Sequence, residues 1–181
     1  ENLLIAKHVK LVGAGSGSDA ATNTVLQPPS GTVVTITGSG ESDSNPLLLK
    51  SLRITPQGTV GINLGNTDLS AAETVNYLRL EDVQVVGSLN QASGEHERCL
   101  NLDLNKSVVH LSVVNSGFSQ CDYGWYFGKH DGTTFTPNTA QYVTVSNSSF
   151  ADNSYKGLYV EMLSDATFNS VAVTNNGQIA N

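Results

Sequence analysis

Apolar residues recur along the chain in a fixed pattern of paired positions. Residues 111–118 and 143–150 show it most clearly, with apolar residues at the first, third and eighth positions and Ser at the sixth. Residues two apart lie on one face of a β-strand, whereas the step of three between the two pairs requires a bend. The pattern therefore predicts two short strands that meet at a corner.

The same pattern fits six windows, in which every inward position is apolar except Ser116 and Ser148. The inward residues are Leu4, Ala6, Val9 and Leu11; Leu47, Leu49, Leu52 and Ile54; Leu78, Leu80, Val83 and Val85; Leu111, Val113, Ser116 and Phe118; Val143, Val145, Ser148 and Phe150; and Ala166, Phe168, Val171 and Val173. The window ends are 23 to 43 residues apart, a period typical of solenoids. We expect these side chains to be buried: Leu52, Val83, Leu111, Phe118, Val145, Phe150 and Val171.

The corner position of each window carries a small or polar residue that suits a tight bend. The six corner residues are His8, Ser51, Asp82, Asn115, Asn147 and Ser170. We expect them to stack into a polar ladder.

A third strand is expected to close each repeat, and three of the five candidate segments share a Gly-apolar-polar-apolar theme, which a fourth follows with Cys99 in place of Gly. The candidates are residues 33–36, 61–64, 99–102, 124–127 and 157–160, with Ile62, Leu100, Trp125, Leu158, Leu64, Leu102, Phe127 and Val160 facing inward. The sequence thus predicts an all-β chain, a right-handed parallel β-helix of about six coils with three short strands per coil, as one domain over residues 1–181. An antiparallel sandwich also uses short alternating strands, but Asn176-Gly177 is the only hairpin signal of its type.

Composition fits strands and turns, because 39% of the 181 residues are apolar and only 14% are charged. The net charge of −7 and the lack of a basic stripe do not favour nucleic acid as a partner. An acidic surface also repels polyanions unless calcium bridges the two. No run of 18 apolar residues predicts a membrane span. Cys99 and Cys121 are compatible with one disulfide or with two free thiols.

Together with the repeat, residues 8–15 resemble the first coil of the pectate-lyase-like right-handed β-helix superfamily. The resemblance covers the whole chain, but it lies in the fold signature and not in an active site. It implies a β-helix whose relatives include pectin-degrading lyases and hydrolases, epimerases, phage tailspikes and non-catalytic adhesin domains. Fold membership does not choose among these functions.

The catalytic motifs of those relatives are largely missing. Asn66-Thr67-Asp68 matches one polygalacturonase motif, but it falls in a loop, and the paired Asp, Gly-His-Gly and Arg-x-Lys motifs are absent. Arg53 faces outward, where a lyase would use a base, without an acidic ladder beside it. In the segment 94–99, His96 lies between Glu95 and Glu97. This arrangement suits a metal or acid–base site, or simply a polar loop.

The outer face of the third strand is the strongest candidate site. Tyr126 and Tyr159 are expected to lie side by side in a row with Asn63 and Asn101. Carboxylates follow two residues after Asn101, at Asp103, and two residues after Tyr159, at Glu161. Aromatic faces beside carboxylates and amides are suited to sugars, although plain cross-strand tyrosine stacking explains the same pattern. The candidate carbohydrate-binding residues are Tyr126, Tyr159, Asn101, Asp103, Glu161, His130 and Asp131.

These observations favour a non-catalytic extracellular or cell-surface domain with a structural, adhesin-like or carbohydrate-contacting role, the partner being a polysaccharide or cell-surface glycan. The alternative is a polysaccharide lyase, glycoside hydrolase or epimerase. No cofactor is implied, and calcium is compatible with this class. Both ends look like cut faces, because only three residues precede Leu4 and the last repeat lacks its third strand. We therefore expect further coils or end-to-end association.

Overall fold

The computed structural model describes residues 2–68, 70–89, 96–128 and 139–177, which form sixteen β-strands and no helix. Six strands form the first sheet: β1 (Leu3–Ile5), β4 (Val34–Ile36), β6 (Val60–Leu64), β8 (Arg98–Leu102), β11 (Tyr123–Phe127) and β14 (Lys156–Val160). Ten strands form the second sheet: β2 (Lys10–Val12), β3 (Val25–Leu26), β5 (Leu47–Ile54), β7 (Glu73–Val86), β9 (Lys106–Val114), β10 (Gly117–Ser119), β12 (Thr139–Ser146), β13 (Ser149–Ala151), β15 (Leu163–Asn169) and β16 (Ala172–Thr174).

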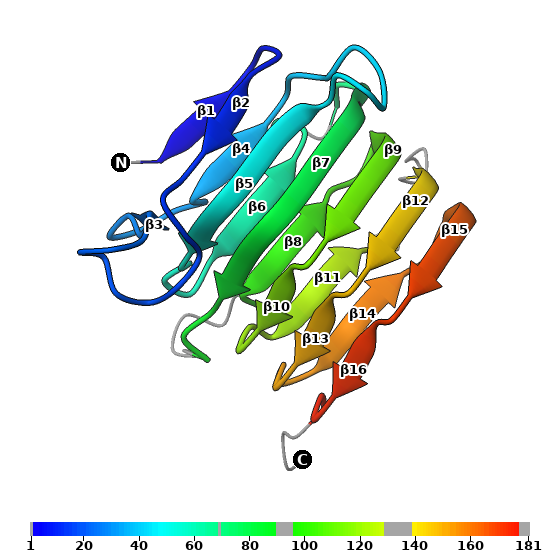
Figure 1. The fold of residues 1–181 in the computed structure, drawn as a ribbon. Coiled ribbons are helices and arrows are strands. Elements are labelled where there is room, and N and C mark those ends of the chain that lie inside the picture. The colour runs from blue at the N-terminus through cyan, green and yellow to red at the C-terminus, as the bar shows by residue number, and fades with distance from the viewer. Residues whose placement is uncertain (1, 69, 90–95, 129–138, 178–181) are drawn as a thin grey trace.

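All paired strands of both sheets run parallel, and the chain alternates between the sheets as it advances (Figure 1). One hydrophobic core contains side chains from both sheets, including Ile62 and Trp125 from the first and Leu49 and Val83 from the second. The prediction of an all-β chain with parallel strands is confirmed, and the curled sheets are consistent with a β-helix-like architecture.

The predicted register holds from the second window to the sixth. The first inward positions lie opposite one another along the second sheet: Leu47, Leu78, Leu111, Val143 and Ala166. The last positions do the same: Ile54, Val85, Phe118, Phe150 and Val173. Of the seven residues expected to be buried, six are buried, and Val171 is half-buried against the core.

The prediction for the first window is wrong. Leu4 is 64% exposed, whereas Ile5 is buried, because β1 belongs to the first sheet and pairs with β4. Leu11 lies opposite Leu49 and not opposite Ile54. A shift of one residue along a strand exchanges its two faces, and the run Leu3-Leu4-Ile5 has no polar residue to mark the outward side.

The sixth window pairs as predicted but remains exposed. Phe168 is 41% and Val173 is 53% exposed, since β15 and β16 are edge strands of the second sheet. Among the described residues, no strand covers their far side.

The predicted third strands are confirmed as β4, β6, β8, β11 and β14. Their predicted inward side chains are buried, apart from half-buried Leu158 and Val160 in β14. The strand β1 is an additional member of this sheet that the pattern missed.

The predicted corners have left-handed backbone, which bends the second sheet. Ser51, Asp82, Asn115, Asn147 and Ser170 have φ between 49° and 55°, a region that short polar residues tolerate better than most. His8 is not in this row, because the register of β2 places it beside Pro46, whose carbonyl lies 3.1 Å from His8 Nε2. A second left-handed row of Tyr77, His110, Tyr142 and Asp165 makes another corner in the same strands.

The two cysteines form a disulfide. Cys99 in β8 is bonded to Cys121, and both are buried, with their Cα atoms 5.8 Å apart. The structure thus decides between the two states that the sequence left open.

Candidate functional site

The expected tyrosine pair lies on the outer face of the first sheet. Tyr126 pairs with Tyr159, and their ring centroids are 5.2 Å apart. Tyr123 and Tyr155 extend this pair, with stacked rings whose centroids are 5.6 Å apart. We call Tyr123, Tyr126, Tyr155 and Tyr159 the tyrosine patch.

Two basic side chains of the same chain already contact the rings of the tyrosine patch. The guanidinium of Arg98 lies 4.1 Å from the ring centroid of Tyr126, and the ammonium of Lys156 lies 4.5 Å from that of Tyr159. These are cation–π contacts. They cover ring surface that a sugar would otherwise use.

The polar residues expected beside the patch also interact with other residues of the chain. The Tyr159 hydroxyl donates a hydrogen bond to Glu161, and this bond raises the pKa of Tyr159 to about 12. Asp103 lies 3.8 Å from Arg98 Nη1. Asn101 is buried, and its amide is satisfied within the chain: it donates to Asn63 over 2.6 Å and accepts from Arg98 over 3.0 Å. His130 and Asp131 lie outside the described residues.

The segment 94–99 contributes a buried structural carboxylate. Glu97 accepts hydrogen bonds from the backbone N–H groups of Gly58 and Ser88, each over 2.8 Å. Burial raises the pKa of Glu97, and these donors oppose the rise. His96 Nδ1 lies 3.6 Å from the buried carboxylate of Asp122. Glu95 lies outside the described residues, among which no three His, Cys, Asp or Glu side chains are grouped to hold a metal ion.

The Asn-Thr-Asp motif orders a loop around a buried lysine. The ammonium of Lys106 donates to Asn66 Oδ1 over 3.0 Å, to the Asp68 carbonyl over 2.7 Å and to the Ala71 carbonyl over 2.5 Å. Asp68 itself accepts from the hydroxyl and backbone N–H of Ser70. The side chains of Asn66 and Asp68 therefore both form hydrogen bonds within the loop, as expected if this motif is part of a loop.

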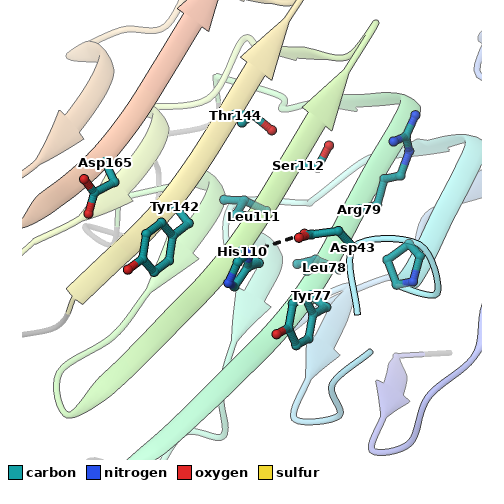
Figure 2. Close-up of a pocket in the computed structure, with 11 residues that line it drawn as sticks. Asp43, Tyr77, Leu78, Arg79, His110, Leu111, Ser112, Tyr142, Thr144 and Asp165 are labelled. Carbon is teal, nitrogen blue, oxygen red and sulfur yellow. Dashed lines mark ion pairs between the residues drawn. The ribbon is translucent and has the colours of Figure 1, made fainter. Parts of the chain in front are cut away.

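A groove of about 440 Å³ lies on the outer surface of the second sheet, and sequence reasoning missed it (Figure 2). A row of rings forms one side, and outward side chains of β7, β9 and β12 form the floor. The lining residues are Asp43, Pro46, Tyr77, Leu78, Arg79, His110, Leu111, Ser112, Tyr142, Thr144 and Asp165.

The rings of the groove form a stacked ladder. The imidazole of His110 lies between Tyr77, 4.6 Å away, and Tyr142, 4.9 Å away, and each pair of planes is 26° apart. Each ring residue immediately precedes the first inward position of its window, and those positions pair in register. The backbone pairing therefore sets the ring spacing, close to the roughly 4.8 Å between strands.

The charges around the ladder have mixed sign. His110 Nδ1 lies 3.3 Å from Asp43 Oδ1. Arg79 Nε donates to Glu81 over 2.8 Å, and Lys50 donates to the same carboxylate over 2.7 Å. These two bonds lower the pKa of Glu81. The Asp165 carboxylate forms no hydrogen bond or ion pair within the part of the chain that the structure describes.

A sequence signal for this groove existed. Ring-bearing residues precede the first inward position in four successive windows, namely Pro46, Tyr77, His110 and Tyr142. Their alignment is visible only once the windows are placed in register.

Comparisons with protein-family models, curated proteins and solved structures found no match. Within the described ranges, no helix is long and apolar enough to cross a membrane.

Proposed function

We propose that this chain is a non-catalytic extracellular β-helix domain that contacts carbohydrate, either on a polysaccharide or on a cell surface. The finer fold we propose is a right-handed parallel β-helix of about six coils over residues 1–181. Two parallel sheets that the chain visits alternately support the helix, and parallel crossovers are right-handed in about 98% of cases. The disulfide supports an extracellular location, where such bonds persist.

The groove over the second sheet is the observation that carries the carbohydrate proposal. It combines aromatic rings with carboxylates, hydroxyls and a guanidinium. Ligand sites typically join apolar or aromatic surface with a few polar groups, in volumes of roughly 300–1,000 Å³. The tyrosine patch offers a second aromatic surface, but Arg98 and Lys156 cover part of its rings.

The test is a glycan array, followed by calorimetry with the tightest-binding oligosaccharide. We expect binding without the release of products, and we expect the double variant Tyr126→Ala/Tyr142→Ala to abolish it. Arg53→Ala, which removes an outward side chain elsewhere on the second sheet, should bind like the wild type. Absence of any saccharide binding, or full binding by the double variant, would overturn the proposal.

A second candidate function is an enzyme of the lyase, hydrolase or epimerase classes. The pairing of His110 with Asp43 inside the groove favours it, because a carboxylate orients an imidazole for proton transfer. Release of new reducing ends or unsaturated products by the wild type, lost in His110→Asn, would support this candidate over the first.

A further inference from the structure

We infer that the groove binds an uncharged sugar ring stacked on the free face of Tyr142, at the position that the next ring of the ladder would occupy. This inference rests on the proposed carbohydrate contact. It adds the place of binding and the class of ligand.

The ladder ends one step before the edge of the sheet. Gln141 and Val143 pair with Ser164 and Ala166, so Tyr142 lies opposite Asp165. Both faces of His110 are covered by rings, whereas among the described residues Tyr142 has a ring on one side only, and it is 51% exposed. Asp165, a short side chain in the same left-handed conformation, leaves the next step without a ring.

The surroundings of this step suit hydroxyl groups. Figure 2 shows Asp165 and Tyr142 projecting from neighbouring strands at the same end of the groove. The Asp165 carboxylate has no partner among the described residues, so its oxygens are free to accept hydrogen bonds. Ser112 and Thr144 add hydroxyls on the floor, and these both donate and accept. A pyranose has one apolar face for the ring and hydroxyls at its rim for these groups.

The charges of the lining point to a neutral ligand. Asp43 and Asp165 would repel a uronate, as would the net charge of −7. Arg79 is already paired with Glu81, so its guanidinium is not free to hold the carboxylate of a uronate. A neutral saccharide does not meet the repulsion of the two aspartates.

The experiment titrates the folded chain with cellotetraose, maltotetraose, mannotetraose and tetragalacturonate, and follows binding by calorimetry. We expect at least one neutral tetrasaccharide to bind and tetragalacturonate not to bind. Tyr142→Ala should weaken binding by about 10-fold or more, and Tyr142→Phe, which keeps the ring face, should retain it. Asp165→Tyr should abolish binding, because the new ring fills the free step. Tyr126→Ala tests the tyrosine patch separately. Arg53→Ala removes an outward side chain of the second sheet that does not line the groove, and this control should bind like the wild type.

The outcomes distinguish failure of this inference from failure of the proposed carbohydrate function. If Tyr126→Ala abolished binding of a neutral tetrasaccharide and Tyr142→Ala retained it, the assignment of the binding site to the groove would be wrong. The proposed carbohydrate function would still stand. Preferential binding of tetragalacturonate would overturn the neutral class. Binding of none of the four probes would overturn the inference. The carbohydrate function would then fall only if the glycan array were also blank.

Discussion

Left-handed backbone at residues other than glycine determines where the second sheet bends. This conformation costs an ordinary residue about 1–2 kcal/mol, and Asn and Asp bear it best. The Asn, Asp and Ser corners were therefore predictable from the sequence. The corners at Tyr77, His110 and Tyr142 were not, because aromatic residues give no turn signal.

Among the buried charged residues, Glu97 and Lys106 are buried for structural reasons that the sequence could not reveal. Glu97 and Lys106 both come from polar segments that resemble loops. Each is fully hydrogen-bonded, by backbone N–H donors for Glu97 and by three carbonyl oxygens for Lys106. Buried charges are tolerated in proteins when they are satisfied in this way. The partners come from distant segments, so local spacing does not predict them.

The hydrogen bond between Tyr159 and Glu161 gives a titration test of the tyrosine patch. The pKa of Tyr159 is raised to about 12 from an ordinary 10.0, mainly by this bond. Because the bond needs the phenol proton, its stabilising effect is present below pH 10 and is lost as the pH rises through about 12. Glu161→Gln should return the pKa of Tyr159 towards 10, as measured by tyrosinate absorbance.

The variant Tyr159→Phe assigns the late-titrating component, which is necessary because burial also raises the pKa of Tyr123. An unchanged titration curve in Glu161→Gln would show that the two side chains are not paired in solution.

Strand register was predictable wherever the sequence marked both faces. In the second to sixth windows, apolar pairs alternate with mostly polar residues, and a fixed corner separates the pairs, so a one-residue slip would expose the core. The first window lacked this contrast, and its strands went to different sheets from those expected. The groove arises between elements, from the ladder and Asp43, and so it could not be read from a single window.

The strand β10 provides the test of core packing. Phe118 is fully buried, stacks on Phe150 with centroids 5.3 Å apart and meets the edge of Trp125 at 5.7 Å. Phe118→Ala should lower the free energy of unfolding by roughly 3–5 kcal/mol, because it removes buried ring surface and leaves a cavity. Urea unfolding with an unchanged slope would measure the loss.

The matched control is Phe168→Ala in the edge strand β15, where the ring is already 41% exposed. Its cost should be less than half that of Phe118→Ala. Equal costs would mean that the assigned register of the core is wrong.

At the scale of the whole molecule, parallel architecture follows from a pattern that repeats in one direction. The sequence predicted parallel strands around a common core because each window buries the same face. It predicted three strands per coil, whereas in the structure the strands on both sides of each corner belong to one bent sheet. It did not predict how the outermost strands are covered. In the described structure β1 and β14 are the edges of the first sheet, and β15 and β16 are edge strands of the second.

These edges predict head-to-tail association of copies of this chain. Apolar side chains are exposed at both ends of the stack: Leu4, Val9 and Val12 at one end, and Leu163, Phe168 and Val173 at the other. Unpaired parallel edges are templates for further strands. The two ends differ, so the contact would be heterologous and could propagate.

We expect the sedimentation coefficient to rise with protein concentration, and Phe168→Lys to suppress that rise by placing a charge on the exposed inward face. Thr167→Lys adds the same charge on the other face of β15 and should associate like the wild type, since neighbouring residues on a strand point to opposite faces. Amide exchange gives an independent measure, because a stacked edge gains hydrogen-bond partners. The amides of residues 4–11 and 168–173 should become protected only as the concentration rises. A chain that stays monomeric at high concentration, with these amides already as protected as those of β9, would contradict the association, because its edges would then be stable without a partner.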